Sequence, residues 1–413
     1  MAEMLTLEAF EEASEKVREV TLETKLVESP HFSASTGNRV WLKPENMQRT
    51  GAYKVRGAYY KISTLSPEEL GRGIVTASAG NHAQGVAFAA TRAGARSVVV
   101  MPETTPLIKV ERTKHYGAEV VLHGDVYDEA CDEAMRLAEE EGYTFIHPFN
   151  DPQIIEGQAT LGLDILNEAC CDFHYVLLPI GGGGLMSGVG SVFKSLSPET
   201  CVVGVEASGA ASMRAAFDKG EPVALPEIDN FADGIAVRKV GDVTFDICRE
   251  VVDKLVAVPE GQICTTILRL YNESAMVVEP AGAVSVAALE NIKDEIRGKN
   301  VVCVISGSNN DITRMEEIKE RSQLHEGLQH YFIVRFPQRA GALREFLERV
   351  LGPDDDITFF EYSKKNSRER GPAVVGIELQ RAGDYAPLIK RMKEHNIIYE
   401  YLNDKPDLFQ FLI

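Results

Sequence analysis

A lysine at position 54 stands in an unusual setting for a charged side chain. Residues 50–58 read TGAYKVRGA, so Lys54 lies between a tyrosine and a valine, whereas surface lysines usually stand among other polar residues. A lysine amine can form a Schiff base with an aldehyde, particularly where desolvation lowers its pKa. Lys54 is therefore a candidate for covalent attachment of an aldehyde cofactor.

Four consecutive glycines form a second candidate site. They follow the apolar segment HYVLLPI (174–180), and a helical segment opens directly after them at Leu185. Backbone N–H groups of residues without a Cβ can converge on an anion, and the N-terminus of the following helix adds the positive end of its dipole. The pattern predicts a phosphate-binding loop at Gly181, Gly182, Gly183 and Gly184.

Two better-known phosphate-binding fingerprints fit this loop less well. The dinucleotide fingerprint G-x-G-x-x-G requires a third glycine, and Met186 or Ser187 stands in its place. Glu206 ends the next strand-like run at about the right distance for a ribose hydroxyl, so an NAD enzyme stays an alternative. A P-loop is excluded because no Gly-Lys-Ser/Thr follows the glycines.

Two further strand ends carry side chains suited to an aromatic cofactor. In TASAGNHAQG (76–85), Asn81 can donate and accept hydrogen bonds, so it can hold a hydroxyl or phenolate oxygen. In NVVCVISGSNND (300–311), a buried strand delivers Ser306, whose hydroxyl can donate to a ring nitrogen. Taken alone, each could be an ordinary capping residue. Together with the lysine and the phosphate loop they match one molecule, pyridoxal 5′-phosphate.

The elements that must position these residues alternate between short apolar runs and helical segments up to about residue 320. β-branched runs of five to seven residues separated by helices predict parallel strands buried on both faces, and hence a doubly wound α/β architecture. Ligands of such sheets bind beyond the carboxyl ends of the strands. The predicted strands are 73–78, 96–103, 118–124, 174–180, 201–207 and 300–306.

The pattern changes after a polar helical stretch, 316–330, which is typical of a linker. There follow a strand at 331–336, a helix at 341–352, strands at 357–363 and 373–379, a helix at 385–396 and a strand-like end, DLFQFLI (407–413). The order βαββαβ is that of a ferredoxin-like unit. We expect a catalytic part at 1–320, with a smaller subdomain at about 50–150 inserted in a larger one, and a separate α+β domain at 327–413.

The composition disfavours several classes of partner. The net charge is −19 and no basic cluster is visible, so neither nucleic acid nor an anionic membrane surface is expected as a partner. No apolar run approaches the roughly 20 residues that span a bilayer. Seven cysteines without a C-x-x-C pair predict buried free thiols in a reducing cytoplasm and no patterned metal site. A cation site is left open, with Glu206 as a candidate ligand.

At these motifs the chain resembles the fold-type II pyridoxal-phosphate enzymes, which share the tryptophan synthase β-like fold, and within them the threonine dehydratases (threonine ammonia-lyases) of the isoleucine pathway. LKPENMQRTGAYKVRGA (42–58) is similar to the family's lysine motif, SAGNHAQG (78–85) to its substrate loop and GGGGL (181–185) to its phosphate loop. EPAGA (279–283) and SGSNND (306–311) resemble its later motifs, and FPQRAGALREFL (336–347) resembles its ACT-like regulatory domain.

The resemblance implies a role for each candidate residue. Lys54 would hold the cofactor and Asn81 would bond its phenolic oxygen. The loop from Gly181 to Leu185 would bind the phosphate, and Ser306 would meet the pyridine nitrogen. The substrate would lie against Ser78, Ala79, Gly80, Asn81 and His82. The family often has Ser-Phe-Lys where this chain has Ala52-Tyr53-Lys54, which removes a possible hydrogen bond to the phosphate or the substrate carboxylate.

The activity implied is deamination of L-threonine to 2-oxobutanoate and ammonia, with Lys54 and Ser306 as catalytic residues and Lys54 as the general base. The resemblance also implies a homo-oligomer, dimer or tetramer, and a regulatory domain that senses isoleucine, with valine as an opposing effector. Its ligand carboxylate would meet the turn at Gly341, Ala342 and Leu343. The alternatives are a catabolic serine/threonine dehydratase or another enzyme of the same fold, a non-catalytic amino-acid sensor, and a C-terminal domain that only dimerises.

Overall fold

The computed structural model describes residues 5–362, 370–405 and 408, and the chain divides into two compact units, Met1–Ile312 and Thr313–Ile413. Among the described residues, the first unit contains a six-stranded and a four-stranded sheet, and the second unit contains one four-stranded sheet. No helix of the described residues is both long and apolar enough to cross a membrane.

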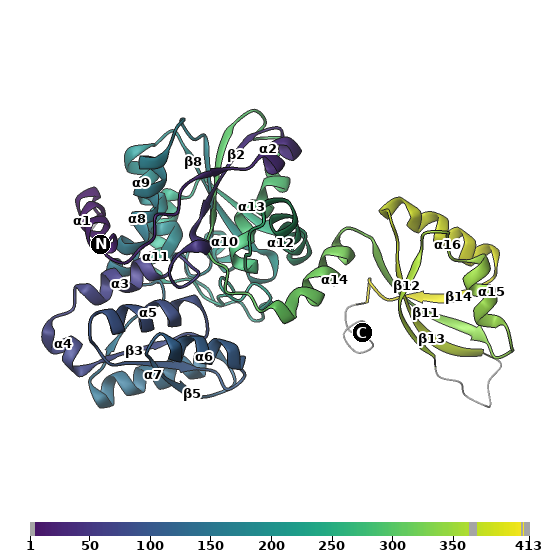
Figure 1. The fold of residues 1–413 in the computed structure, drawn as a ribbon, viewed down its shortest axis with the longest axis horizontal. Coiled ribbons are helices and arrows are strands. Elements are labelled where there is room, and N and C mark those ends of the chain that lie inside the picture. The colour runs from purple at the N-terminus through teal and green to yellow at the C-terminus, as the bar shows by residue number, and fades with distance from the viewer. Residues whose placement is uncertain (1–4, 363–369, 406–407, 409–413) are drawn as a thin grey trace. The chain divides into compact units, whose positions relative to one another are not determined.

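The larger sheet of the first unit has the strand order β1-β2-β10-β7-β8-β9. Figure 1 labels β2 and β8 of this sheet. All neighbouring strands are parallel except β1, which pairs antiparallel with β2. Its strands are β1 (Val27–Glu28), β2 (Arg39–Pro44), β7 (Tyr175–Pro179), β8 (Cys201–Ala207), β9 (Lys254–Val258) and β10 (Asn300–Ile305). The central strands are buried almost throughout, as expected for a parallel sheet covered on both faces.

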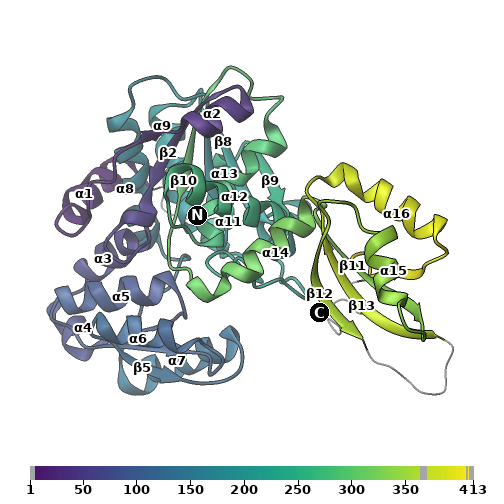
Figure 2. The ribbon, with the colours of Figure 1, turned by 45° about the vertical axis from the view of Figure 1, so that its right-hand side comes forward.

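Helices cover this sheet, and Figure 2 shows α11 (Asp242–Val251), α12 (Glu260–Ser274) and α13 (Pro280–Ile292) beside its strands. Helix α13 is apolar all round, PAGAVSVAALENI, and is therefore buried along most of its length. The remaining helices of the larger subdomain are α1 (Leu7–Val17), α2 (Pro30–Thr36), α8 (Pro152–Glu168), α9 (Gly184–Leu196) and α10 (Ser212–Lys219).

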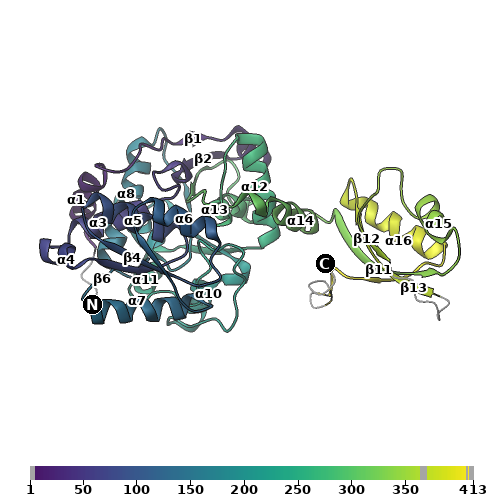
Figure 3. The same cartoon turned by 60° about the horizontal axis from the view of Figure 1, so that its bottom comes forward.

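The smaller sheet is fully parallel, with the order β5-β4-β3-β6. Along β4 (Ser97–Met101) the side chains alternate: Val99 and Met101 pack with α5 and α6, whereas Val98 and Val100 pack with α7. Figure 3 shows these helices with β4 and β6. The other elements are α3 (Val55–Ser63), α4 (Pro67–Arg72), β3 (Ile74–Ala77), α5 (Asn81–Arg92), α6 (Leu107–His115), β5 (Glu119–Leu122), α7 (Tyr127–Glu141) and β6 (Thr144–Phe145).

The second unit begins with α14 (Met315–His325), in the stretch predicted as a polar linker, and continues in the order βαββαβ. Its antiparallel sheet has the order β12-β13-β11-β14, and α15 and α16 pack with it around a core that includes Phe332, Phe346 and Met392. This is the predicted ferredoxin-like arrangement. The elements are β11 (Gln329–Pro337), α15 (Ala342–Arg349), β12 (Asp356–Tyr362), β13 (Arg370–Glu378), α16 (Tyr385–Glu394) and β14 (Ile398–Tyr401).

Some sequence predictions differ from the structure. The final strand was predicted at 407–413, which apart from Leu408 lies outside the described residues, and β14 is the strand that pairs with β11. Strands β1, β2, β6, β9 and β14 were not predicted. All seven cysteines are free as predicted, but only Cys248, Cys264 and Cys303 are buried. Cys170 is exposed because it lies in the loop after α8 rather than in a strand or helix.

Candidate active site

Lys54 lies directly before α3, in a loop that is attached to the end of β10. The N–H of Tyr53 donates to the carbonyl of Ser306 at 3.1 Å, and Ala52 forms an antiparallel bridge with Gly307. The half-buried Lys54 Nζ donates to the carbonyl of Pro148 at 2.8 Å. Burial lowers the pKa of the amine to about 8, against the opposing charge of Glu279, so the neutral form needed by a nucleophile is within reach near neutral pH.

The glycine loop connects β7 to α9. Gly183 has φ +96°, a left-handed conformation that favours glycine, and a Cβ there would lie 2.8 Å from Cβ of Thr244. A Cβ at Gly181 would lie 2.9 Å from Cα of Ile235, and one at Gly182 would collide with the Phe149 ring. Among the described residues, no acceptor is recorded for the N–H groups of Gly181, Gly182 and Gly183. The loop therefore offers unpaired donors at a helix N-terminus.

Phe149 and Pro148 connect the glycine loop with Lys54. The Phe149 ring lies against Gly182, and the preceding residue supplies the carbonyl that binds the Lys54 amine. Gly85 of α5 packs against the Lys54 backbone, because a Cβ at this glycine would lie 3.3 Å from the Lys54 carbonyl. The three motifs that the sequence singled out separately are thus brought together at one edge of the two sheets.

Asn81 is the first residue of α5 and is buried in a hydrogen-bonded chain. Its Nδ2 donates to Oε1 of Glu279 at 2.5 Å, and its Oδ1 accepts from Nδ2 of Asn309 at 2.5 Å. Asn309 Nδ2 also donates to the carbonyl of Thr50 at 2.9 Å. The loop before Lys54 and the loop after β10 therefore share the contacts that hold Asn81.

Ser306 follows β10 and is buried, and its hydroxyl donates to the carbonyl of Ala281 at 3.2 Å. In the predicted substrate loop, the Gly80 N–H donates to Oγ of Ser78 at 3.2 Å, and Ala79 lies between them. His82 Nε2 lies 3.1 Å from the carbonyl of Ile146, and burial lowers the pKa of this imidazole to about 3, which keeps it neutral.

Glu279 is a site residue that the sequence reasoning missed. The motif EPAGA contributes to the family resemblance, but nothing local distinguishes its glutamate from a surface glutamate before a helix. The structure buries it beside Asn81. Burial, reinforced by the charge of Asp233, raises its pKa to about 7. Asp233 itself pairs with Lys109 of α6, which joins the smaller subdomain to the loop 230–236 of the larger one.

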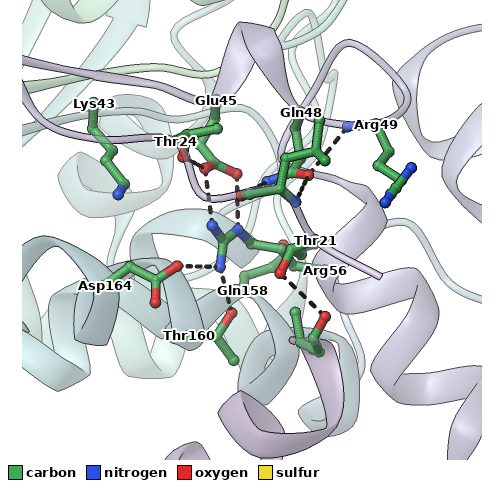
Figure 4. Close-up of polar contacts among 12 residues, drawn as sticks. Thr21, Thr24, Lys43, Glu45, Gln48, Arg49, Arg56, Gln158, Thr160 and Asp164 are labelled. Carbon is green, nitrogen blue, oxygen red and sulfur yellow. Dashed lines mark hydrogen bonds and ion pairs between the residues drawn. The ribbon is translucent and has the colours of Figure 1, made fainter. Parts of the chain in front are cut away.

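Arg56, two residues after Lys54, is the centre of a buried polar network (Figure 4). Its Nε and Nη2 donate to the two carboxylate oxygens of Glu45 at 2.8 and 2.9 Å. Its Nη1 contacts Thr160 at 3.1 Å and Asp164 at 2.7 Å on α8. Thr24 donates to Glu45 at 2.5 Å. The network fixes the start of α3, and with it Lys54, to α8 and to the segment after β2.

Glu206, considered above for a ribose or a cation, instead caps a helix. Its two carboxylate oxygens accept the N–H groups of Met213 and Arg214 at 2.7 and 2.9 Å, at the start of α10. Burial raises its pKa to about 7. Among the described residues, no group of three or more His, Cys, Asp or Glu side chains is arranged to hold a metal ion.

Comparison with known proteins agrees with this geometry. The family described as "Pyridoxal-phosphate dependent enzyme" matches residues 17–307, and the "C-terminal regulatory domain of Threonine dehydratase" matches residues 320–412. The biosynthetic L-threonine dehydratase IlvA of Bacillus subtilis (strain 168) is 51% identical over 404 residues, which cover 97% of this chain and 96% of that protein. The chain belongs to the biosynthetic threonine dehydratases, within the pyridoxal-phosphate-dependent enzymes.

Other members of the family support the assignment over the full length. The corresponding enzyme of Lactococcus lactis subsp. lactis (strain IL1403) is 46% identical over 416 residues, covering 99% of this chain and 100% of that protein. Among solved structures, the processed threonine deaminase isoform 2 of Solanum lycopersicum has a TM-score of 0.73 and 39% identity, covering 77% of this chain and 90% of that one.

The residues of this threonine dehydratase fit the cofactor of the family. The glycine loop offers N–H donors in a space that a Cβ would fill, which suits a phosphate. A buried amine with a lowered pKa suits an aldehyde, and an amide and a hydroxyl are available for the oxygen and nitrogen of an aromatic ring.

Proposed function

We propose that this chain catalyses the pyridoxal-phosphate-dependent deamination of L-threonine to 2-oxobutanoate and ammonia, the first step toward isoleucine. The observation that carries the proposal is the half-buried amine of Lys54 beside a glycine loop with unpaired N–H groups. The names of the relatives, all biosynthetic threonine dehydratases, support threonine as the substrate. When bound, pyridoxal phosphate supplies the electron sink that makes the α-proton of an amino acid acidic.

Lys54 serves as the attachment point and then as the general base at Nζ. Its amine has a pKa of about 8, so a useful fraction is neutral at physiological pH and can accept the α-proton of the substrate. The carbonyl of Pro148 holds the amine at 2.8 Å and limits where it can accept that proton. The other lysine described near this site, Lys109, is paired with Asp233.

The remaining site residues bind and orient the cofactor and the substrate. The loop from Gly181 to Leu185 holds the phosphate through N–H groups at the start of α9. Asn81 donates to the phenolic oxygen, and Ser306 exchanges its 3.2 Å hydrogen bond with Ala281 for one with the ring nitrogen. Ser306 is neutral, so it does not enforce protonation of that nitrogen as a carboxylate would. The substrate carboxylate lies against Ser78 to His82, where the first N–H groups of α5 are free of helical partners.

The second unit serves as an amino-acid sensor. Its cavity of about 340 Å³ is lined by aromatic and basic side chains around the start of α15. The aromatic rings of Phe336, Phe360 and Tyr362 suit a branched aliphatic side chain, and Arg339 and Arg344 suit a carboxylate. We infer that isoleucine is the inhibitor and valine the opposing effector. We also infer that residues 1–320 form the catalytic part and residues 327–413 the regulatory part. We further propose that the protein assembles as a homo-oligomer.

The test is the release of 2-oxobutanoate from L-threonine by the wild type and Lys54→Ala, with and without isoleucine. We expect Lys54→Ala to lose turnover and the visible absorbance of the bound cofactor while it keeps its fold by circular dichroism. A chain truncated after Glu320 should be active but insensitive to isoleucine. Substantial turnover by Lys54→Ala would overturn the catalytic assignment. Threonine kinetics unaltered by millimolar isoleucine and valine would overturn the sensor.

A further inference from the structure

Glu279 has an unusual position for a residue that begins a helix. It is the N-cap residue of α13, yet its carboxylate makes no capping hydrogen bond to its own helix. It accepts instead from Nδ2 of Asn81, a residue 198 positions earlier in the chain. A capping bond that stabilises α13 is thus given up for a contact with Asn81, which points to a role beyond the helix.

The side chain is held from several directions. Gly307 packs so closely that a Cβ there would collide with Oε1, and a Cβ at Gly234 would lie 3.4 Å from the same oxygen. Only 3% of Glu279 is exposed. These contacts therefore hold the carboxylate in one position, in which its oxygens serve as hydrogen-bond acceptors.

This arrangement determines which way round the Asn81 amide lies. In its ionised form Glu279 can only accept, so Nδ2 of Asn81 faces it. The amide Nδ2 of Asn309 donates to the other end, so Oδ1 of Asn81 must face Asn309. Turning the amide over would place oxygen against oxygen at Glu279 and nitrogen against nitrogen at Asn309. The second N–H of Asn81 Nδ2 then has a defined direction.

We propose that Glu279 is a positioning residue that fixes the donor side of the Asn81 amide, so that Asn81 presents an N–H to the cofactor. The inference rests on the role proposed above for Asn81. Glu279 acts through the hydrogen bond that it accepts and not by transferring a proton, and a glutamine, whose Oε1 can accept the same bond, should replace it. An alanine cannot, and it leaves the Asn81 amide oriented by Asn309 alone, with no acceptor for its Nδ2 at this position.

The experiment is titration of the apo-protein with pyridoxal phosphate, followed by visible absorbance, for Asn81→Ala, Glu279→Ala, Glu279→Gln and the double alanine variant. We expect Asn81→Ala and Glu279→Ala each to weaken cofactor affinity by about tenfold, in line with the loss of one hydrogen bond and an unpaired partner. The double variant should be no weaker than Asn81→Ala within about twofold, because both changes remove one interaction. Glu279→Gln should bind within about threefold of the wild type.

The controls separate positioning from folding. Glu206→Gln removes another buried carboxylate that accepts two N–H bonds but does not touch Asn81, and it should keep wild-type cofactor affinity. Asn309→Asp places an acceptor against Oδ1 of Asn81 and should weaken binding as Asn81→Ala does, which tests the inference if Glu279→Ala fails to fold. Thermal unfolding of each apo-protein reports folding.

Several results would overturn the inference. One is wild-type cofactor affinity in Glu279→Ala or Asn309→Asp. Another is a double alanine variant whose loss of cofactor affinity is the product of the two single losses. A third is a Glu279→Gln variant that binds the cofactor as weakly as Glu279→Ala. If Asn81→Ala binds the cofactor normally, the proposed role of Asn81 itself fails and the inference falls with it. If Asn81→Ala binds the cofactor weakly but Glu279→Ala binds it with wild-type affinity, the proposed role of Asn81 stands and only the positioning role of Glu279 is rejected.

Discussion

Replacing Arg56 by methionine should destabilise the first unit strongly and in a pH-dependent way. The guanidinium is 1% exposed and Glu45 is fully buried, and the pair is joined by two hydrogen bonds of 2.8 and 2.9 Å (Figure 4). Removing one partner of a buried pair leaves an uncompensated charge and costs about 3–5 kcal/mol. Total unfolding free energies are about 5–15 kcal/mol, so the loss is a large fraction of the total.

The pH dependence follows from Glu45. Burial alone would raise the pKa of this carboxyl, but the charge and hydrogen bonds of Arg56 outweigh burial and hold it below the ordinary 4.5. Because the pKa of Glu45 is lower in the folded than in the unfolded chain, its ionisation stabilises the fold at any pH above the unfolded-state pKa. This stabilisation is lost as the pH falls through the folded-state pKa. Without Arg56, burial dominates and raises the pKa, so the variant loses stability as pH rises above 4.5. The destabilisation should therefore be larger at pH 8 than at pH 5.

The assay is urea unfolding followed by the fluorescence of Trp41, the only tryptophan of the chain, which lies in β2 close to Glu45. Arg39→Met is the matched control, because Arg39 also donates two bonds, of 3.0 Å, to one carboxylate, Glu28, but this pair is exposed. Its unfolding midpoint should shift far less.

Adding Glu45→Leu to Arg56→Met should recover much of the stability, because an apolar pair can replace a buried ion pair. The reasoning is refuted if Arg56→Met costs less than about 1 kcal/mol at pH 8, the usual range for an exposed pair. It is equally refuted if the loss is the same at pH 5.

Three further changes test the site and the regulatory cavity. Gly183→Asp should abolish cofactor binding in an absorbance titration, because its φ of +96° and the Thr244 contact exclude a side chain and its charge repels a phosphate; unchanged affinity would place the phosphate elsewhere. The rate of cofactor loading should rise with pH and level off above about 8, the pKa of the buried Lys54 amine, whereas a midpoint near 10.5 would contradict its burial. Leu343→Asp, in the cavity of the second unit, should remove the response to isoleucine without changing turnover in its absence, and a normal response would exclude this cavity as the effector site.

Much of the fold was predictable because its determinants are local. The apolar runs that became β3, β4, β5, β7, β8 and β10 are continuous and flanked by helical periods, which is how buried parallel strands are recognised. β2 was missed because Lys43 and Pro44 interrupt its apolar pattern. Lys43 is fully buried only because Glu168 of α8, 125 residues away, pairs with it at 2.7 Å. β1 and β6 have two residues each, too few for any periodic signal.

The sequence by itself determined the kinds of group available to the site. A lysine, a glycine run and an asparagine each stand at the start of a helix, and a serine stands at the end of a strand. Their side-chain chemistry does not depend on the fold. It also determined, through local periodicity, the first five elements of the βαββαβ order of the C-terminal unit, whereas the last strand, β14, lies before the predicted one.

Only the tertiary structure decided how these groups act on one another. Burial lowers the pKa of Lys54 to about 8 and raises that of Glu279 to about 7, and burial is a property of the packed chain. The bond between Glu279 and Asn81 joins residues 198 positions apart, and the contact of Arg56 with Thr160 spans 104. Hydrogen bonds at such separations leave no local pattern, because the fold alone brings their partners within reach.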